Sequence, residues 1–553
     1  KAMTEGFQGE MPENLKEKGN ISACLKHFAC YGYPEGGREY DNVELSERTL
    51  RQDYLSGYQG AVDGGCRMAM TSFNTLNRVP STANKWLMRK VLREDLGFDG
   101  VLISDYSAVE ELIPHGIAED KREAAKLAIE AGVDIDMMSD VYLHYLKELV
   151  TSGEVDETIV DEAVLRILKL KNDLGLFENP YKDASEEDEK NLILCDAHRA
   201  AAREAAAKTF VLLKNEKLLP LSRKKKVIWA GPYTASRELL SRWSIFGEHE
   251  AVETIEDVLQ KKQIEAECIT GCNILSDEEC KVWQVEQELS DKPRDEQWLE
   301  TITHEDTVVC VLGEHESQSG EAASRAFLTL PEEQQVLFEK IAERTSNIVT
   351  VVITGRPLDL RRISERSKAV IMAWRPGTMG AEAIIDIVYG RLNPSGKLSV
   401  SIPWCVGQVP ISYWDVKTGH IFTEDNSENR FTSRYMDIPN TPLYPFGYGL
   451  SYTEFDISDI DVQIGQDKKV HIHCNVCNTG NVAGAEVVQC YYETLYASVV
   501  RPKKELVRFR KVFLEPGEKK DVDFFIDQEE FSYYGKNMEI CLLYTSPSPR
   551  DAH

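Results

Sequence analysis

The sequence lacks any long hydrophobic run. No stretch approaches the about 18 consecutive apolar residues of a transmembrane helix, so we expect no membrane partner. It also lacks an initiator methionine and the basic, then apolar, segment of a signal peptide, since it opens on Lys1-Ala2-Met3-Thr4-Glu5-Gly6. We therefore expect the natural start, with any targeting signal, to lie outside this sequence.

Basic residues are scarce relative to acidic ones. The chain has 64 Lys and Arg against 92 Asp and Glu, which gives a formal net charge of -28. This charge repels a phosphate backbone, and no Lys/Arg stripe interleaved with aromatic residues offsets it, so we expect no nucleic-acid partner. A neutral substrate is compatible with this balance, although acidity is more often simply a means of solubility.

Paired cysteines are also lacking. The 13 cysteines are scattered and odd in number, and Cys310 lies in an apolar run that suits a reduced, buried thiol better than a disulfide framework. Such thiols favour the cytoplasm, with the periplasm and secretion left open. Cys474 and Cys477 form a Cys-x-x-Cys on an alternating strand without a second ligand pair, so we expect neither a metal nor another cofactor.

Residues 1–176 alternate short apolar runs with amphipathic stretches. We predict strands at 23–30, 67–73, 101–104 and 133–137, and a helix at 155–174. Strands separated by helices at this spacing are parallel and joined by right-handed crossovers. Only about half of the strands of a closed barrel fit here, so we predict the C-terminal part of a TIM-type β/α barrel, whose first part is missing from the sequence.

A second α/β pattern follows a predicted linker and leading helix at 177–208. Its expected strands are 210–213, 227–230, 308–312, 348–353 and 369–373, and its expected helices include 332–343 and 381–388. This alternation predicts a doubly wound α/β sandwich over 209–415, in which ligands bind outside the carboxyl ends of the strands.

The pattern changes again after a connecting segment at 416–455. Period-2 alternation, with turn signals between the runs, predicts an immunoglobulin-like β-sandwich over 456–542. Residues 543–553 contain two prolines where a last strand should run. We therefore interpret them as a non-native tail and expect the last strand to be missing.

Three sets of polar residues follow predicted strands. Asp105 ends the strand at 101–104, where a barrel presents catalytic groups, but a metal ligand or a helix cap is about as well supported by the residues alone. Lys26 and His27 form a weaker signal, because a histidine beside apolar residues is usually structural and a lysine at a strand end is usually solvated. The loop with Glu314, Glu316 and Glu321 also follows a strand, although an ordinary solvated acidic loop is the better interpretation without further information.

Ordered motifs link these residues to a known family. They are Lys26-His27-Phe28, Gly37-Arg38-Glu39-Tyr40, Thr71-Ser72-Phe73-Asn74, Leu92-Arg93, Gly97-Phe98-Asp99-Gly100, Ser104-Asp105, Gly175-Leu176-Phe177, Val211-Leu212-Leu213-Lys214-Asn215, Asn393-Pro394-Ser395-Gly396-Lys397-Leu398, Tyr444-Pro445-Phe446-Gly447-Tyr448-Gly449-Leu450-Ser451-Tyr452, Asn478-Thr479-Gly480 and Gly484-Ala485-Glu486-Val487-Val488-Gln489. With them the chain resembles bacterial β-glucosidases of glycoside hydrolase family 3. The resemblance implies a barrel, an α/β sandwich and a fibronectin type III-like domain.

The resemblance also implies roles. Asp105 would be the nucleophile, Glu321 the general acid/base, and Lys26 and His27 ligands of the sugar hydroxyls. Retaining hydrolysis needs one ionised and one protonated carboxyl group, about 5 to 5.5 Å apart. We expect burial and the neighbouring charge to raise the pKa of the acid, and Lys26 with nearby donors to keep Asp105 ionised.

Further candidates rank lower. Glu111 is the rival acid/base, because the same loop carries Asp105. Arg38, Arg67 and Trp243 are candidate sugar ligands, since aromatic faces stack on sugar rings, although a tryptophan is nearly as often part of a core. The family's barrel supplies an Asp and an Arg from earlier strands, and nothing before Lys26 matches them, so we expect this chain alone to bind sugar poorly.

The expected substrate is an oligosaccharide or glucoside, and the expected activity is that of a retaining, exo-acting β-glucosidase. Two alternatives remain open: β-xylosidase or mixed β-glucosidase and arabinosidase activity, and a non-catalytic carbohydrate-binding protein. The sequence leaves the oligomeric state open.

Overall fold

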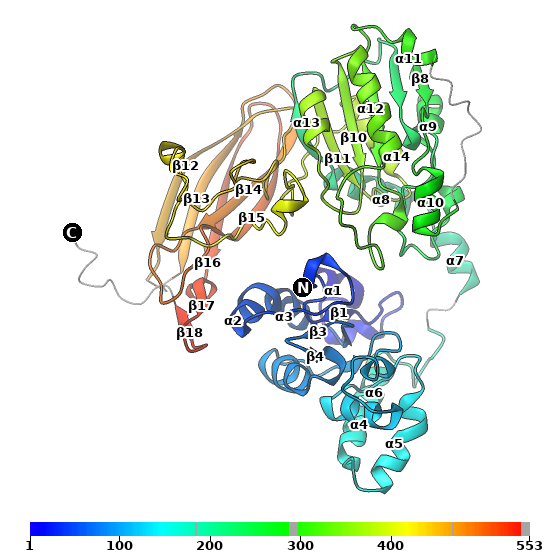
Figure 1. Ribbon diagram of the computed structural model, residues 1–553, viewed down its shortest axis with the longest axis vertical. Helices are drawn as coiled ribbons and strands as arrows, with labels where there is room; N and C mark the ends of the chain where they lie inside the picture. The colour runs from blue at the N-terminus through cyan, green and yellow to red at the C-terminus, as the bar shows by residue number, and fades with distance from the viewer. Residues whose placement is uncertain (183–184, 287–296, 467–468, 543–553) are drawn as a thin grey trace, which may run out of the picture. The chain divides into compact units, whose positions relative to one another are not determined.

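The computed structural model describes residues 1–182, 185–286, 297–466 and 469–542. The chain divides into two compact units (Figure 1), one containing Lys1–Lys190 and the other containing Asn191–Lys536. The break between them falls within the predicted linker at 177–208. Among the described helices none is both long and apolar enough to cross a bilayer.

The first unit is built on a parallel sheet in the order β1 (Cys24–Phe28), β2 (Met68–Thr71) and β5 (Val101–Ile103). A small hairpin and several helices accompany it: β3 (Thr75–Leu76), β4 (Val79–Pro80), α1 (Ala2–Gln8), α2 (Glu47–Thr49), α3 (Leu55–Asp63), α4 (Lys121–Ala131), α5 (Val141–Thr151) and α6 (Glu157–Asp173). Phe28, Leu102 and Ile129 are buried in its core. Three of the predicted strands and the helix at 155–174 are therefore confirmed.

The predicted strand at 133–137 is wrong. Only Ile135 forms a parallel bridge, to Ile103. The backbone amides of Asp134 and Ile135 both donate to the carbonyl of Leu102, at 2.7 and 3.2 Å, and a carboxylate oxygen of Asp134 accepts from the Leu102 amide at 2.8 Å. The Asp134 side chain thus accepts the hydrogen bond of a backbone amide that a β-ladder would use, and regular strand pairing does not form here.

The second unit begins with α7 (Glu186–Leu192), which starts in the first unit, and α8 (Asp196–Thr209). Its sheet has the order β6 (Val211–Asn215), β11 (Ala369–Trp374), β10 (Ile348–Ile353), β9 (Val308–Gly313), β7 (Val227–Ala230) and β8 (Ala266–Ile269). All neighbouring pairs are parallel except β6 with β11, which is antiparallel. Every residue of β9 and β10 is buried, as expected of strands covered on both faces.

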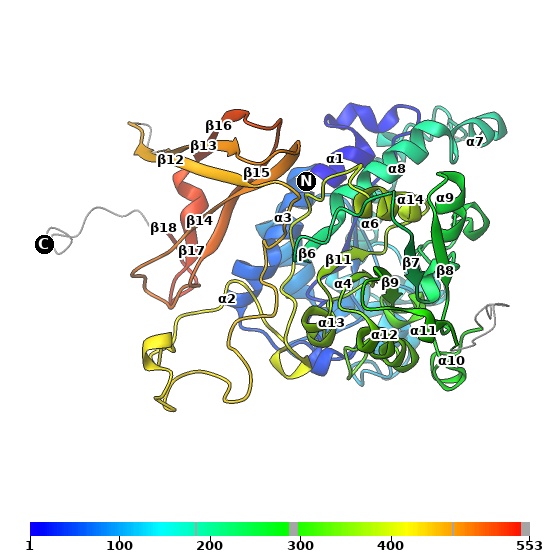
Figure 2. The ribbon, with the colours of Figure 1, turned by 90° about the horizontal axis from the view of Figure 1, so that it is seen from above.

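Helices cover both faces of this sheet, as Figure 2 shows. On one face the core joins α8, α9 (Ile255–Lys261) and α14 (Gly380–Val388) to residues such as Val309 and Val351. On the other it joins α11 (Gln297–Thr301), α12 (Glu332–Arg344) and α13 (Arg361–Arg366) to Val308 and Val352. A further helix, α10 (Asp277–Trp283), follows β8. Alternate residues of each strand therefore face opposite helical layers, which confirms the doubly wound sandwich.

Beyond the connecting segment the same unit contains antiparallel strands. One sheet has the order β12 (Phe455–Ile464), β13 (Val470–Asn478) and β16 (Lys519–Ile526), and β14 (Gly484–Tyr492) pairs with β15 (Glu505–Leu514). Val476, Val488 and Phe524 pack between the two sheets. A hairpin of β17 (Ser532–Tyr534) and β18 (Ile540–Leu542) follows. The predicted non-native tail at 543–553 lies outside the described residues.

Candidate active site

The carboxyl ends of three adjacent strands meet around Asp105. This residue follows the end of β5 at Ile103, and its backbone amide donates to the Thr71 hydroxyl, at the end of β2, over 3.4 Å. His27 comes from β1, on the far side of β2. Parallel strands deliver their last residues to one edge of the sheet, so these groups converge although they are far apart in sequence.

The Asp105 carboxylate accepts a hydrogen bond at one oxygen and lies beside an imidazole at the other. The Tyr106 amide donates to Oδ1 at 2.7 Å, and Nε2 of His27 lies 3.2 Å from Oδ2. Asp105 is only 8% exposed. The carboxylate is therefore fixed in direction and little solvated, as a nucleophile requires.

Burial raises the pKa of Asp105 above its usual range, while the Tyr106 amide and the charge of Lys26 oppose that rise. That Asp105 is kept ionised stays a prediction; Lys26 and the Tyr106 amide act in its favour, but burial has the larger effect on the pKa. The reason is that Lys26 is exposed, so its charge acts through solvent, whereas the carboxyl group itself is largely desolvated.

Glu111 lies close enough to Asp105 for their charges to interact. It belongs to the single turn Glu110–Leu112 and is half-buried. Burial, and then the charge of Asp105, raise the pKa of its carboxyl group. Two carboxyl groups with raised pKa values thus share this part of the first unit, which keeps Glu111 in place as a rival acid.

An aromatic cluster beside His27 was missed by sequence reasoning. The His27 ring meets Tyr31 edge-on with centroids 4.9 Å apart, Tyr31 lies 6.0 Å from Phe73, and Phe73 lies 5.4 Å from Tyr40. Phe73 and Tyr40 both belong to the ordered motifs, and this membership could have predicted that they lie near the site. Together these rings fix the orientation of the imidazole that contacts Asp105.

The two arginine candidates of the first unit form ion pairs with aspartates. Arg67 precedes β2, at its amino end, and its guanidinium is 3.6 Å from Asp99 and 4.0 Å from Asp173. It therefore lies at the opposite edge of the sheet from Asp105, and these contacts give no support to its predicted role as a sugar ligand. Arg38 is largely exposed and forms an ion pair with Asp41.

In the second unit Glu314 directly follows β9 and is completely buried. Its Oε1 accepts from Arg325 at 2.6 Å, and its Oε2 accepts from the Thr354 hydroxyl at 2.6 Å and the Gly355 amide at 3.3 Å. Arg356 forms a longer ion pair with the same carboxylate, at 3.6 Å. The interpretation of this segment as an ordinary solvated acidic loop is therefore wrong at its first residue.

His315 shapes the next turn, Glu316–Gln318. Its Nδ1 lies 2.9 Å from the Ser317 hydroxyl and accepts from the Ser317 amide at 3.2 Å. Burial, and then the charges of Arg375 and Arg242, lower the pKa of His315 to about 4. The imidazole is therefore neutral at neutral pH, and it works as a cap of this turn.

Glu321 is half-buried and lies between two residues with positive φ, Gly320 at 99° and Ala322 at 58°. Arg356 donates to the carbonyls of Gln318 and Ala323, at 2.8 and 2.7 Å, and so holds the backbone on both sides of Glu321. We call residues 318–325 the acid loop.

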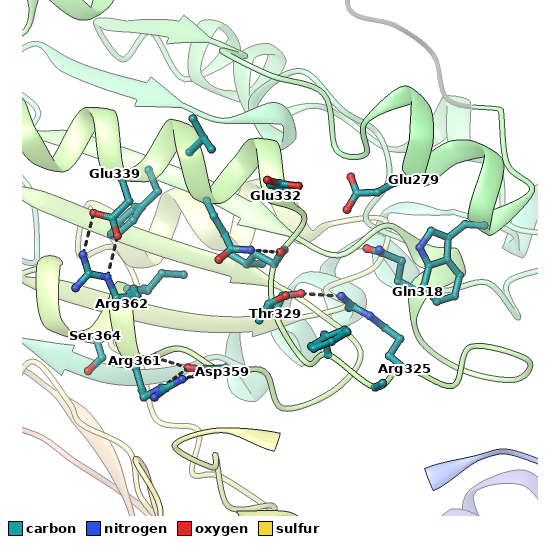
Figure 3. Close-up of a pocket in the computed structure, with 18 of the residues that line it drawn as sticks. Glu279, Gln318, Arg325, Thr329, Glu332, Glu339, Asp359, Arg361, Arg362 and Ser364 are labelled. Atoms are coloured by element: carbon teal, nitrogen blue, oxygen red, sulfur yellow. Dashed lines mark hydrogen bonds and ion pairs between the residues drawn. The ribbon is translucent and has the colours of Figure 1, made fainter. Parts of the chain in front are cut away.

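Trp243 is 59% exposed and lines a cavity of about 430 Å³ with Ser319, Gly320, Trp374 and Arg375. The structure thus brings Trp243 beside the residue that precedes Glu321. A larger cavity of about 1860 Å³ is lined by other residues of the acid loop, among them Gln318 and Arg325 (Figure 3). Within the described ranges there is no group of three or more His, Cys, Asp or Glu side chains arranged to hold a metal ion.

Three family models match the chain. They are the Glycosyl hydrolase family 3 N terminal domain over residues 1–170, the Glycosyl hydrolase family 3 C-terminal domain over 210–452 and the Fibronectin type III-like domain over 486–543. They confirm the predicted succession of a barrel domain, an α/β domain and a fibronectin type III-like domain.

Individual relatives cover most of the chain. A periplasmic beta-glucosidase of Salmonella typhimurium is 36% identical over 97% of this chain and 72% of its own length. A beta-xylosidase of Formosa agariphila is 33% identical over 97% of this chain and 74% of its own length. The solved structure of a beta-glucosidase from Listeria innocua in complex with glucose is 40% identical with a TM-score of 0.91, and the match covers 98% of this chain and 73% of that one.

Proposed function

The chain belongs to glycosyl hydrolase family 3 and is a glycoside hydrolase, and we propose that it is a retaining, exo-acting β-glucosidase that releases terminal β-D-glucosyl residues from non-reducing ends. The observation that carries this proposal is the buried Asp105 carboxylate, which accepts from the Tyr106 amide and lies 3.2 Å from His27 at the carboxyl edge of the sheet. The named activities of the Salmonella and Listeria relatives support glucose as the glycone.

The proposed reaction uses two carboxyl groups. Asp105 attacks the anomeric carbon while the bond to the leaving oxygen breaks and Glu321 gives that oxygen its proton. The Glu321 carboxylate then takes a proton from water, whose oxygen displaces Asp105 from the anomeric carbon. Both residues return to their first state, and two displacements retain the anomeric configuration.

Other residues bind the substrate in this proposal. Lys26 and His27 donate to hydroxyls of the glycone, since they lie beside Asp105 at the same strand ends. Trp243 stacks on the leaving group, because it borders the cavity next to the acid loop. Glu111 tunes the charge at Asp105 rather than transferring the proton.

A covalent label tests the nucleophile. A glucosyl fluoride whose 2-hydroxyl is replaced by fluorine forms the glycosyl-enzyme but destabilises the charge needed to hydrolyse it. We expect the full-length protein to gain one such sugar, mapped to the peptide containing Asp105, and Asp105→Gly to lose both the label and about 10,000-fold or more of its aryl-glucoside turnover. A label on another residue, or wild-type turnover by Asp105→Gly, would refute the assignment.

A second candidate activity is β-xylosidase, favoured by the Formosa relative. The two activities differ in whether the site accepts the hydroxymethyl group of glucose. Parallel kinetics on aryl β-glucoside and aryl β-xyloside separate them, and we expect kcat/KM to be higher on the glucoside. Binding of glucose by titration calorimetry without turnover of either substrate would instead identify a non-catalytic carbohydrate-binding protein.

A further inference from the structure

The acid loop is anchored to the sheet through one buried carboxylate, and we propose that Glu314 is a positioning residue that sets the place of Glu321. The inference rests on the proposed role of Glu321 as acid/base and extends it to a residue that does not touch substrate. Glu314 directly follows β9 and is completely buried, whereas Glu321 is half-buried on the loop that continues from it.

Both oxygens of Glu314 are already occupied. Oε2 receives the Thr354 hydroxyl and the Gly355 amide, which follow the end of the neighbouring strand β10, and Oε1 receives Arg325. A completely buried carboxylate with this many donors has no lone pair directed at solvent or substrate. Glu314 is therefore a fixed anchor and not an alternative proton donor.

Arg325 and Arg356 connect Glu314 to the acid loop. Arg356 is drawn to Glu314 at 3.6 Å and donates to the carbonyls of Gln318 and Ala323, one on each side of Glu321. Arg325 bonds Glu314 and also donates to the carbonyl of Thr329 at 2.8 Å, a contact drawn in Figure 3. One carboxylate thus contacts the two guanidinium groups that bind two backbone carbonyls of the acid loop and one just beyond it, at Thr329.

The shape of the backbone supports the same link. Gly355, whose amide donates to Glu314, packs against Ser319 so closely that any Cβ at position 355 would overlap the Ser319 side chain. Gly313, just before Glu314, likewise lies against the carbonyl of Ile353, where a Cβ would clash with backbone. The ends of β9 and β10 and the acid loop therefore form one packed unit, and a shift of Glu314 moves the loop.

Leaving-group dependence tests this role. A dinitrophenyl group departs without a proton, whereas an alkyl group needs the acid. For Glu314→Gln in the full-length protein we expect kcat/KM to fall about 10- to 100-fold on an alkyl β-glucoside and less than about 3-fold on dinitrophenyl β-glucoside, because a small misplacement of the acid is costly. Equal losses on both substrates would overturn the proposal.

The matched control is Asp386→Asn. Asp386 is also completely buried and paired with cations of the same unit, Arg203, Lys262 and, at 3.7 Å, Arg391, but it lies on α14 and not on the acid loop. We expect this variant to lose stability while its kcat/KM ratio between the two substrates stays at the wild-type value. A changed ratio in Asp386→Asn would show that any buried charge loss mimics the effect, and would overturn the proposal.

Two further variants complete the test. If Glu314→Gln does not fold, Arg356→Lys serves instead, because it removes the guanidinium group that donates to the carbonyls of Gln318 and Ala323. Its kcat/KM must then fall mainly on the alkyl glucoside, and an equal fall on both substrates overturns the proposal. Glu321→Ala measures the direct effect of removing the acid. If Glu321→Ala loses kcat/KM equally on both substrates, the proposed acid/base role of Glu321 is refuted, and the positioning role of Glu314 with it. If Glu321→Ala loses kcat/KM mainly on the alkyl glucoside but Glu314→Gln loses it equally on both, only the positioning role is refuted.

Discussion

Nε2 of His27 lies 3.2 Å from Oδ2 of Asp105, although β1 and β5, which carry the two residues, are separated by β2. The contact spans the sheet at its carboxyl edge, and Thr71 at the end of β2 receives the Asp105 amide between them. The position of Asp105 is therefore set by three strands at once, and changes at its neighbours have measurable effects on its ionisation.

Lys26→Met is expected to move the acid limb of the pH profile. The charge of Lys26 lowers the pKa of Asp105, against the larger effect of burial, so its removal raises the pKa further. The nucleophile must be ionised, and the acid limb of kcat/KM therefore shifts to higher pH. We also expect kcat/KM at its optimum to fall about 10- to 100-fold from the lost hydrogen bond of a charged donor to sugar.

Lys26→Arg is the control for this prediction. It keeps the positive charge but changes the geometry of the donor. Its kcat/KM should fall while the acid limb remains at the wild-type pH. A shift of equal size in both variants would show that the charge of Lys26 does not act on Asp105.

Glu321→Ala and Glu111→Ala should differ in rescue by azide. Without its acid/base the enzyme still forms the glycosyl-enzyme from dinitrophenyl β-glucoside, but water is no longer deprotonated in the second step. Azide needs no base, so it attacks the anomeric carbon directly and releases β-glucosyl azide. We expect about 10-fold or greater acceleration for Glu321→Ala and none for Glu111→Ala, measured as dinitrophenolate release with product analysis. The reverse pattern would identify Glu111 as the acid/base.

The central strands were predicted well from the sequence because strands buried on both faces consist of continuous apolar residues. Strands β7 and β10 lie within the predicted bounds, as runs of apolar residues bounded by turns. Strand β8 was missed because its residues are only partly buried, and the antiparallel direction of β6 depends on its partner β11 rather than on its own residues. The apolar run at 133–137 matched a strand pattern, but the Asp134 carboxylate accepts from the Leu102 amide, which a strand ladder would use.

The candidate site was predictable where chemistry follows strand ends, and less so where it depends on tertiary partners. Asp105, Lys26 and His27 were found from position and motif. Glu314 was not, because the residues around it are typical of a solvated loop. Its burial depends on Arg325 and Thr354, which lie 11 and 40 residues away in the sequence. Arg67 begins the predicted strand at 67–73, at the opposite end from the residues near Asp105, and its role as a sugar ligand stays a prediction.

Asp386→Asn is expected to lower the free energy of unfolding by about 3 to 5 kcal/mol, because it leaves Arg203 and Lys262 without their buried partner. The ion pairs hold the pKa of Asp386 below its usual range even though burial acts in the opposite direction. Its stabilisation is thus present at neutral pH and is lost as pH falls through the lowered pKa. Urea unfolding at neutral pH measures the loss.

Glu204→Gln on α8, which breaks only an exposed pair with Lys208, should leave the unfolding midpoint unchanged.

Asp105→Asn should abolish turnover and yet stabilise the folded chain at neutral pH. The pKa of Asp105 is raised in the folded state by burial, so the folded state binds the proton more tightly than the unfolded state does. Ionisation therefore costs stability as pH rises from the ordinary value of 3.8 through the raised pKa, and the full cost is present above it. Asparagine keeps the shape without that charge, so the melting temperature of the variant should exceed that of the wild type at neutral pH, with the difference vanishing as pH falls toward 3.8.

Asp99→Asn provides a control of opposite sign for the same measurement. A hydrogen bond from Lys169 lowers the pKa of Asp99, so its charge stabilises the folded state above the ordinary carboxyl pKa. Its removal should lower the melting temperature at neutral pH, and this difference too should disappear in acid. If Asp105→Asn melts below the wild type at neutral pH, then His27 and Lys26 stabilise the ionised carboxylate more than burial destabilises it. The nucleophile would then owe its ionisation to its neighbours, and the acid limb of kcat/KM would lie below the pH of an ordinary carboxyl group.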